Sequence, residues 1–343
     1  MNTKKQLIDG FTIVELLVVT VIIGILAAIT VVSYAGITQR AVVTSLQSDL
    51  NNAADLLRID QAHSSTGVFP ATLAVANGGS DIPASKDTAY QYTVNNTNTP
   101  KTFCLTATKN AQSYFITQEG LPMPGPCPVL YLDAGIPTSY PGSGTTWTDL
   151  SGNGNNGTLL NGVGYSSVNS GTLAFDGIDD YVRLSFPPIL GTGNFTILSV
   201  SKLTGGQGGK VVFGGGPDST TGFYAHHYQY TAQGGTKWIS GWGSASSASL
   251  SVQDYDLTSY HFAASVYDGA TNTSYVDGAV GSIVAKTNSN LQAGSYWAIG
   301  SSGGSVAGNY MAGNIGCIQI YNRALSATEI QQNFNTLRGR YGI

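Results

Sequence analysis

Glutamates that could form a catalytic carboxyl pair are scarce in this chain of 343 residues. The three present are Glu15, Glu119 and Glu329, and only Glu329 follows Val129. Retaining glycoside hydrolysis needs two carboxyl groups about 5–5.5 Å apart. Glu329 also completes the pattern Ser326-Ala-Thr-Glu329, which is typical of a capping box at a helix start. The glutamates therefore argue against hydrolysis and give Glu329 a structural role.

Two further patterns could carry acid-base or metal chemistry. Asp254 and Asp256 have the spacing that puts two carboxylates on one face of a strand, but aspartates near turns are more often turn formers. His226 and His227 would point to opposite faces of a strand and do not form a metal pair by themselves. We therefore expect no enzymatic activity, with a membrane-tethered glycan hydrolase as the alternative.

A third acidic group consists of Asp176, Asp179 and Asp180. Carboxylate oxygens are hard ligands of the kind that calcium takes in proteins. The spacing of these residues is not a recognised calcium-loop pattern, and turn-forming or surface carboxylates are the favoured interpretation. Calcium is thus the candidate cofactor, as the less favoured of the two alternatives.

Aromatic residues alternate along residues 222–230 and recur soon after. The candidates for stacking on a sugar are Tyr224, His226, Tyr228, Tyr230, Trp238 and Trp242. The first four would share one face of a strand, because alternate residues point to the same side. Aromatic strand residues more often pack against a neighbouring strand, and we favour that alternative here. Trp147 and Trp297 lie in apolar segments and are expected in the core.

Glu15 lies in an apolar run that begins at Phe11. The 24 residues at 16–39 carry no charge, which exceeds the roughly 20 needed to cross a bilayer as a helix. A carboxylate in such a run costs about 2.5–3.5 kcal/mol on insertion scales unless it has a partner. Lys4 and Lys5 precede the run and predict a cytoplasmic amino terminus with the rest of the chain exported.

The elements that position these residues follow from periodicity. Apolar residues recur every three or four positions beyond Arg40, which predicts one stripe of an amphipathic helix. The stripe comprises Val43, Leu46, Leu50, Ala53, Ala54 and Leu57. No proline interrupts residues 11–69, so a continuous helix over about 11–62 is expected, roughly 75 Å long. Pro70 sets its limit, because the residue before a proline avoids the helical region.

Short alternating runs at 90–94, 102–105 and 113–116 predict a small antiparallel sheet after this helix. Cys104 and Cys127 enclose 22 residues. In an exported segment a disulfide between them is expected, worth about 3 kcal/mol, with two free thiols as the alternative. The proline-rich residues 121–128 predict a semi-rigid, extended linker that holds the following domain at a distance.

Glycine is spread unevenly, with eight of the 44 residues before Val129 and 36 after it. This contrast indicates a second, turn-rich domain. Asp-Gly pairs separate its short apolar runs, and residues 262–284 predict three strands joined by two such turns. Many short strands at this spacing predict a β-sandwich, in which Cys317 is a buried thiol. A net charge of −4 and dispersed lysines and arginines exclude a basic surface for nucleic acid.

The segment Gly10-Phe11-Thr-Ile-Val-Glu15, followed by Leu-Leu-Val-Val, resembles the type IV prepilin signature. The resemblance implies that a prepilin peptidase cuts after Gly10, that Phe11 is N-methylated, and that Glu15 acts in subunit assembly. The new amine at Phe11 could neutralise Glu15 of a neighbouring subunit inside a filament. Val32 lies where members of this family often have a proline. A plain membrane anchor with a tolerated glutamate is the alternative.

Four segments after Val129 resemble the laminin-G-like or concanavalin A-like jelly-roll family. They are Trp147-Thr-Asp-Leu-Ser-Gly-Asn-Gly-Asn-Asn-Gly-Thr158, Leu173-Ala-Phe-Asp-Gly-Ile-Asp-Asp-Tyr-Val182, Tyr275-Val-Asp-Gly278, and Ile318-Gln-Ile-Tyr-Asn-Arg-Ala-Leu-Ser326 with Glu329. The resemblance implies an extracellular sandwich that binds carbohydrate or protein, often with calcium. Jelly-roll glucanases of this superfamily use two glutamates on one strand, which the segment after Val129 lacks.

These features predict a leader at 1–10, an α+β pilin-like domain at 11–128 and an all-β jelly-roll sandwich at 129–343. The expected function is a minor or tip subunit of a type IV pilus whose lectin-like domain adheres to a glycan, a surface or a partner cell. Its partners would be other pilin subunits and the prepilin peptidase. It would lie in the inner membrane before assembly and in the extracellular pilus afterwards. A pseudopilin of a type II secretion-like system is the leading alternative.

Overall fold

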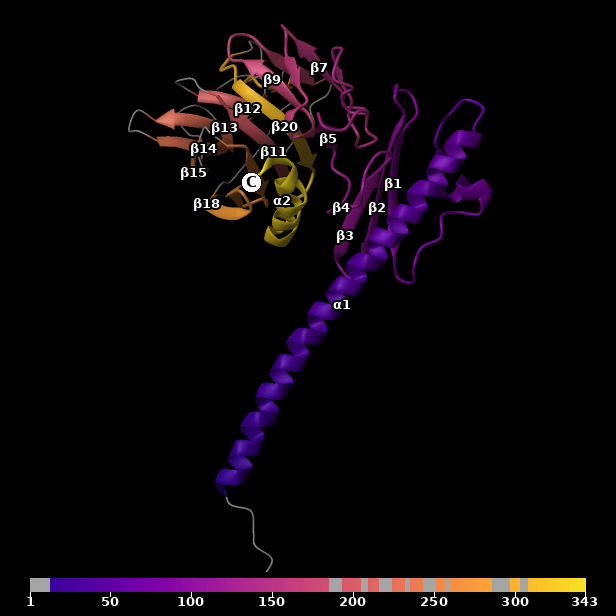
Figure 1. Cartoon of the computed structure of the whole chain (residues 1–343), viewed down its shortest axis with the longest axis vertical. Coiled ribbons are helices and arrows are strands. Elements are labelled where there is room, and N and C mark those ends of the chain that lie inside the picture. The colour runs from indigo at the N-terminus through magenta and orange to yellow at the C-terminus, as the bar shows by residue number, and fades with distance from the viewer. Residues whose placement is uncertain are drawn as a thin grey trace, which may run out of the picture.

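The computed structural model describes residues 13–184, 193–204, 209–215, 224–231, 235–242, 251–256, 259–285, 297–302 and 308–343. A long helix, a small sheet and a β-sandwich lie side by side in these residues (Figure 1). The small sheet is the middle of the three layers, between the upper half of the helix and the sandwich. The N-terminal helix followed by an antiparallel sandwich agrees with the predicted fold class.

Helix α1 spans Ile13–His63 without a break, which is about 75 Å at 1.5 Å per residue. Its first part, Ile13–Thr30, has no buried residue. Further along, Leu46, Leu50 and Leu57 are fully buried, so the predicted apolar stripe is confirmed. The two halves therefore have different surroundings, because only the second half packs on protein.

The small sheet is antiparallel. Its order is β1 (Ala89–Asn95), β2 (Thr102–Lys109), β3 (Gln112–Thr117) and β4 (Met123–Pro124). Two short 3-10 helices, η1 (Leu73–Val75) and η2 (Asn77–Gly79), connect α1 to β1. The first three strands lie over the runs that alternate in the sequence.

Strand β2 is buried on both of its faces. Phe103 and Leu105 belong to the core that β2 shares with α1, whereas Cys104 between them belongs to a core shared with the sandwich. Strand β3 repeats the arrangement, with Ile116 on the helix side and Phe115 on the sandwich side. Successive strand residues point to opposite faces. The small sheet is therefore covered by α1 on one face and by the sandwich on the other.

Two antiparallel sheets form the sandwich. The β11 sheet has the order β18 (Ala279–Ala285), β17 (Thr271–Val276), β16 (His261–Tyr267), β11 (Phe195–Leu203), β20 (Ala312–Tyr321), β9 (Thr172–Asp176) and β8 (Gly164–Ser166), and β5 (Leu130–Asp133) also pairs with β20. The β12 sheet has the order β15 (Ser251–Tyr255), β14 (Gly235–Trp242), β13 (Tyr224–Thr231), β12 (Gly209–Gly215), β19 (Trp297–Ile299), β10 (Tyr181–Leu184), β7 (Gly157–Leu160) and β6 (Thr146–Trp147). A 3-10 helix, η3 (Val168–Ser170), connects β8 to β9.

The main core lies between these two sheets. It contains Trp147 and Trp297, as predicted, and both are almost completely buried. The predicted three-strand unit is also confirmed, because β16, β17 and β18 are consecutive neighbours joined at Gly269 and Gly278. Both glycines have positive φ, which the tight Asp-Gly turns require.

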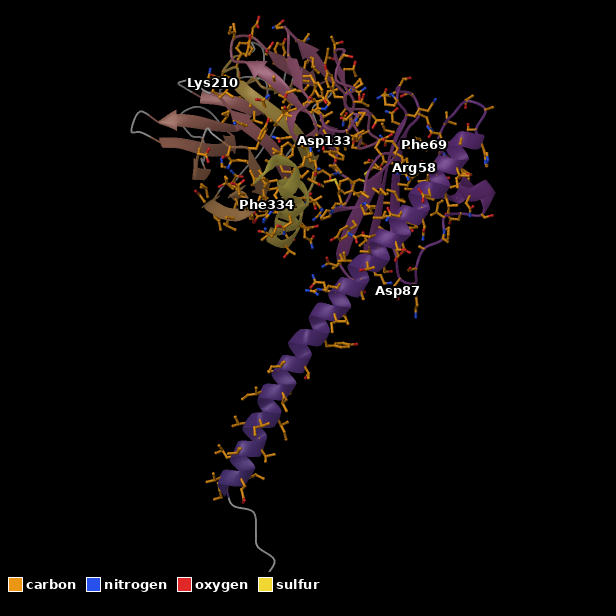
Figure 2. All side chains as sticks on the ribbon, in the orientation of Figure 1. Arg58, Phe69, Asp87, Asp133, Lys210 and Phe334 are labelled. Atoms are coloured by element: carbon orange, nitrogen blue, oxygen red, sulfur yellow. A yellow bond between two sulfur atoms is a disulfide. The ribbon has the colours of Figure 1, made fainter. Side chains whose placement is uncertain are left out.

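Helix α2 (Ala327–Tyr341) covers the other face of the β11 sheet. Ser326 and Glu329 form the predicted capping box at its start. Ile330 and Phe334 lie in the core that also contains Phe262 of β16, and Phe334 is labelled where α2 meets the sandwich in Figure 2. This second core reaches the small sheet, because Cys104 and Phe115 belong to it.

Residues 121–128 do not form the extended spacer that their prolines predict. Met123 and Pro124 form β4, which pairs with β3, and both are buried. Tyr131, just beyond this segment, donates its hydroxyl to the sulfur of Met123 at 3.3 Å and packs edge-on against Phe115. The proline content predicts that the segment is stiff, but it does not predict that β3 and Tyr131 pack against Met123. The sandwich is docked directly on the small sheet.

A close backbone approach completes this docking. Gly152 has φ +81°, and a Cβ atom at this position would lie 2.9 Å from the carbonyl oxygen of Thr93 on β1. A Cβ atom on the neighbouring Gly154 would lie 2.2 Å from the side-chain amide of Asn95. Only glycine fits both the conformation and the space at position 152. The turn at residues 151–154 thus joins the sandwich to the edge of the small sheet.

Candidate functional site

The acidic group identified in the sequence comes together at one end of the sandwich. Asp176 ends β9, and Asp179 and Asp180 lie in the turn before β10. Gly177 has φ +80° and permits the tight reversal. Carboxylate oxygens from all three aspartates lie within 4.8 Å of one another. We call these three residues the acidic cluster.

The members of the acidic cluster have different surroundings. Asp176 accepts a hydrogen bond from the backbone N–H of Ile178 at 2.8 Å, which lowers the pKa of Asp176 below its usual value. Asp180 is buried, and its Oδ2 accepts from the N–H of Asp176 at 3.0 Å. Its Oδ1 has no hydrogen-bond partner among the described residues. Burial, together with the charges of Asp176 and Asp179, raises the pKa of Asp180.

This donor set fits a hard divalent cation. Calcium takes six to eight oxygen ligands and favours carboxylates. The acidic cluster offers three carboxylates, and the Oδ1 of Asp180 is a buried acceptor that no described residue satisfies. The turn-forming interpretation also holds, because Asp176 accepts hydrogen bonds within its own turn. The same three aspartates therefore form a turn and provide a group of carboxylates that is compatible with a cation.

The aromatic row lies on two neighbouring strands. β13 carries Tyr224, His226, Tyr228 and Tyr230, and β14 carries Trp238 and Trp242. The register pairs Tyr224 with Trp242 and Tyr228 with Trp238. Position 226 lies opposite Phe213 of β12, whose ring is in the main core. The side chains of β13 and β14 lie outside the described part of the chain, so the predicted sugar-binding face stays a prediction.

The N-terminal site is described only from Ile13 onward. Gly10 and Phe11, the predicted processing position, lie outside the described residues. Glu15 is in the first turn of α1. Among the described helices, α1 contains one segment, Ile13–Thr30, that is long and apolar enough to cross a membrane, with a mean hydropathy of 2.7. By length and composition, this segment is able to serve as a membrane anchor or as a signal sequence.

The cysteines follow the expected pattern. Cys104 and Cys127 are joined by a disulfide, which confirms this pairing. The bond connects the central strand β2 to the residue just before the sandwich begins, and the N–H of Cys127 donates to the hydroxyl of Thr106 at 2.8 Å. Cys317 is a buried free thiol. Burial raises the pKa of this thiol well above its usual value, so the reactive thiolate is disfavoured.

The carboxylates considered for hydrolysis have structural partners where they are described. Glu329 accepts hydrogen bonds from Arg323 and from the N–H of Ser326. Burial alone would raise the pKa of Glu329, but these donors lower it overall. Asp256 accepts from the N–H of Ser259 at 2.9 Å, as a turn former does. The side chain of Asp254 lies outside the described residues.

Among the described residues, three buried acidic residues were not singled out from the sequence: Asp49, Asp133 and Asp149. Asp149 accepts hydrogen bonds from the N–H groups of Tyr131, Ser151 and Asn155, each at 2.9 Å. Burial raises the pKa of Asp149, and these donors oppose that effect. It therefore holds together the turn that docks on the small sheet. Its place in the Trp147–Thr158 segment was the only indication in the sequence.

The second missed residue, Asp133, forms an ion pair with Arg340 of α2, with the guanidinium donating at 2.8 Å and 2.6 Å. Figure 2 labels Asp133 where the sandwich faces the small sheet. Burial alone would lower the pKa of Arg340, but the Asp133 carboxylate raises it overall. The partners are 207 residues apart in the chain, and nothing in the local sequence relates them.

Comparison with known families supports the sandwich. Residues 176–331 match the family model of the Concanavalin A-like lectin/glucanases superfamily, called Laminin_G_3. The match covers the acidic cluster and most of the sandwich, but it begins after the small sheet and β5. No curated protein sequence matches the chain. The jelly-roll part of the predicted resemblance is therefore supported.

Several solved structures align with part of this chain. Domain 4 of an extracellular arabinanase from Geobacillus stearothermophilus, solved with arabinotriose, has 15% identity and a TM-score of 0.45, covering 54% of this chain and 90% of that domain. A Trypanosoma rangeli sialidase has 13% identity and a TM-score of 0.44, covering 73% of this chain and 53% of its own. The binding domain of botulinum neurotoxin serotype D has 11% identity and a TM-score of 0.46, covering 61% and 51%. This chain thus spans about half of the sialidase and of the toxin domain.

Proposed function

We propose that this chain is a subunit of a type IV pilus-like filament whose sandwich binds a glycan or another ligand outside the cell. The observation that carries this proposal is the two-part helix α1. Its first part is apolar and exposed, whereas its second part lies under the small sheet. An exposed apolar helix of this length needs lipid or other helices around it. Membrane storage followed by helix bundling meets that need.

Glu15 supports assembly by helix bundling. A carboxylate in apolar surroundings favours a cationic partner. Cleavage after Gly10 would give Phe11 a charged amine, and the amine of one subunit would pair with Glu15 of its neighbour. The proposed partners are therefore the prepilin peptidase and other pilin subunits. The inner membrane is the proposed location before assembly, and the extracellular filament afterwards.

The layer order supports display of the sandwich at the outside of a filament. Helix α1 and the sandwich cover opposite faces of the small sheet. If the α1 helices bundle at the centre, each sandwich points away from the bundle. We propose a minor or tip position, because residues 129–343 would crowd neighbouring subunits along a shaft.

The test is processing and assembly of the full chain. We expect a prepilin peptidase to remove residues 1–10 and the new terminus to gain a methyl group, both measured by mass spectrometry. In a host that builds type IV pili, antibodies against the sandwich should label filaments in electron micrographs. Glu15→Ala should be processed but absent from filaments, whereas Glu119→Ala at an exposed position should assemble normally. Retention of the leader after peptidase treatment would contradict the proposal.

A pseudopilin of a secretion system would share the same helix and leader. Long labelled filaments favour the pilus. A secretion defect in a deletion strain without any filaments favours the pseudopilin, whose sandwich would contact secreted cargo or cap a short fibre.

For the sandwich we propose binding without hydrolysis. The support is chemical: Glu329 is held by Arg323 at a helix start, and it is the only glutamate after Val129. The matching family model is named for both lectins and glucanases, so the comparison is compatible with either activity. A glycan array probed with the detergent-solubilised full chain should give binding, with and without calcium. Release of reducing ends from a polysaccharide panel would instead support a hydrolase.

We further propose calcium as the ion of the acidic cluster. The support is the proximity of three carboxylates and the unpartnered oxygen of Asp180. Bound calcium would neutralise the repulsion among these carboxylates and stabilise the turn between β9 and β10.

A further inference from the structure

A polar cavity of about 480 Å³ opens where α2 ends on the β11 sheet. Its walls come from β8, η3, β11, β20, the segment before β16 and the end of α2. Binding sites for small molecules usually have volumes of about 300–1,000 Å³. None of the described residues that line this cavity belongs to the acidic cluster, and strands β13 and β14 lie in the other sheet of the sandwich. It is called the α2 cavity below.

The fold holds the walls of the α2 cavity in fixed positions. Lys202 and Asn314 are cross-strand partners on β11 and β20. Across from them, Arg340 donates from Nε to the carbonyl oxygen of Asn169 at 3.1 Å while its other nitrogens pair with Asp133. Arg340 therefore ties η3 to α2. A site built on strands and on a pinned helix is pre-organised, which reduces the ordering that binding requires.

The neutral groups of the α2 cavity suit a sugar ring. Tyr260 and Tyr341 have ring centroids 5.4 Å apart, and Tyr260 is only partly buried. Tyrosine offers an apolar ring face together with a polar hydroxyl. The hydroxyl of Tyr341 is buried, with no hydrogen-bond partner in the part of the chain that the structure describes. Side-chain amides of Asn169 and Asn314 add donors and acceptors for hydroxyl groups.

The charge of the α2 cavity is one-sided. Lys202 lines it, is partly buried, and has no ion-pair partner within the described part of the chain. No aspartate or glutamate is among the described residues that line the cavity. A partly buried ammonium among neutral lining residues favours an anionic group on the ligand.

We propose that the α2 cavity binds a sugar unit that carries a carboxylate, as in a uronic-acid polysaccharide. Lys202 pairs with the carboxylate, Tyr260 packs against the sugar ring, and Asn169 and Asn314 bond its hydroxyls. This inference rests on the proposed glycan binding of the sandwich. It does not depend on filament assembly.

The experiment compares two matched probes on the detergent-solubilised full chain by titration calorimetry. Oligogalacturonate should bind, and its affinity should fall as salt is raised. A neutral galacto-oligosaccharide of equal length should bind at least about tenfold more weakly, because it lacks the charge-assisted hydrogen bond. Lys202→Met and Tyr260→Ala should each weaken oligogalacturonate binding by about tenfold or more. Lys210→Met, on β12 of the other sheet and not among the lining residues of the cavity, should leave this affinity unchanged.

Thermal unfolding of each variant verifies that the fold is kept. Equal affinity of Lys202→Met and the unmodified chain for oligogalacturonate would overturn the site. Equal affinity for the acidic and the neutral probe would overturn the ligand class. If another glycan on the array binds and oligogalacturonate does not, the proposed function stands and this inference fails.

Discussion

Asp180 and Asp149 are both buried, but their hydrogen bonding differs. Asp149 has donors for both carboxylate oxygens, whereas one oxygen of Asp180 has no donor among the described residues. A buried acceptor left unsatisfied costs about 1–3 kcal/mol. Asp149 therefore acts as a completed structural group within a turn. The Oδ1 of Asp180 is available to a ligand such as a cation, and binding at this atom can be measured.

We expect calcium to raise the melting temperature of the full chain through the acidic cluster. At a calcium concentration about 100 times the dissociation constant, the stabilisation is about 2.7 kcal/mol. Asp180→Asn should lose most of this effect, because it removes a charge from the ligand set. In EDTA the variant should be at least as stable as the unmodified chain, since repulsion within the cluster is reduced. Thermal unfolding with calcium or EDTA measures both effects.

Asp87→Asn is the matched control for this test. Asp87 is exposed, far from the sandwich, and has a positive φ that asparagine tolerates (Figure 2). Its response to calcium should equal that of the unmodified chain. An unmodified chain whose melting temperature does not change with calcium would rule out the ion.

His261 gives a second prediction at this scale. Its Nδ1 lies 2.7 Å from Asp277 and its Nε2 lies 3.2 Å from Asp256. Burial alone would lower the pKa of His261, but the two aspartates raise it overall. The charged form is thus favoured in the folded state. Its contribution is fully present below the ordinary histidine pKa of about 6.5 and is lost as the pH rises through the higher folded value.

His261→Gln should therefore destabilise the chain more at pH 5.5 than at pH 8.5. We expect the loss in the free energy of unfolding to be about 1 kcal/mol larger at pH 5.5, because a charge-assisted hydrogen bond contributes about that much more than a neutral one. Denaturant unfolding at both pH values measures it. An equal loss at both pH values for His261→Gln would mean that packing alone is responsible.

Among the elements, the small sheet and the sandwich are connected by a disulfide as well as by the backbone. The disulfide joins β2 to Cys127, immediately before the chain enters the sandwich. Residues 105–126, including β3 and β4, are thus enclosed between two linked points. Because Cys104 also packs in the core shared with the sandwich, the bond stabilises the joint as well as the sheet.

Replacing Cys104 and Cys127 together by alanine should lower the free energy of unfolding by about 3 kcal/mol. The entropy of the unfolded chain rises when the closed loop is opened. Denaturant unfolding measures the change, and a reducing agent should lower the midpoint of the unmodified chain but not that of the variant. Cys317→Ala, at a buried free thiol, should keep the sensitivity to reductant. An unmodified chain insensitive to reduction would contradict the prediction.

Element types were predictable where local chemistry determines them. The apolar stripe predicted α1, and the Asp-Gly turns predicted the strands β16 to β18. The pair Ser326 and Glu329 predicted the start of α2. The burial of β2 and β3 on both faces was not predicted. The available indication was the adjacent apolar residues Phe103-Cys104 and Phe115-Ile116. A strand with one solvent-exposed face alternates apolar and polar residues, whereas a strand buried on both faces has consecutive apolar residues.

For the whole molecule, one apolar core is shared by the small sheet, the sandwich and α2. The core that contains Cys104 and Phe115 also contains Tyr131 and Phe334 of the sandwich unit. Such a continuous apolar contact couples the small sheet and the sandwich, unlike the polar interfaces of loosely linked domains. The sandwich therefore keeps a fixed orientation to α1. In a filament this arrangement would present every ligand site in the same direction.

Gly152→Val should break this coupling. The new Cβ atom would lie 2.9 Å from the carbonyl oxygen of Thr93, in a conformation with φ +81° that valine avoids. We expect calorimetry to show one thermal transition for the unmodified chain and two for Gly152→Val, because the sandwich of the variant no longer docks. Gly144→Val tests strain alone, since Gly144 has φ +93° with no neighbour within 4 Å. A single unchanged transition in Gly152→Val would contradict a coupled core.

The sequence by itself determined the features that rest on neighbouring residues. These are the apolar helix with Glu15, the turns, the helix cap, and the scarcity of glutamates that argues against hydrolysis. Tertiary structure decided that Met123 and Pro124 are buried beside β3, that Asp133 pairs with Arg340, and that the α2 cavity forms where distant segments converge. The physical reason is separation along the chain. Burial and pairing between residues more than 100 positions apart depend on packing, which local periodicity and composition do not encode.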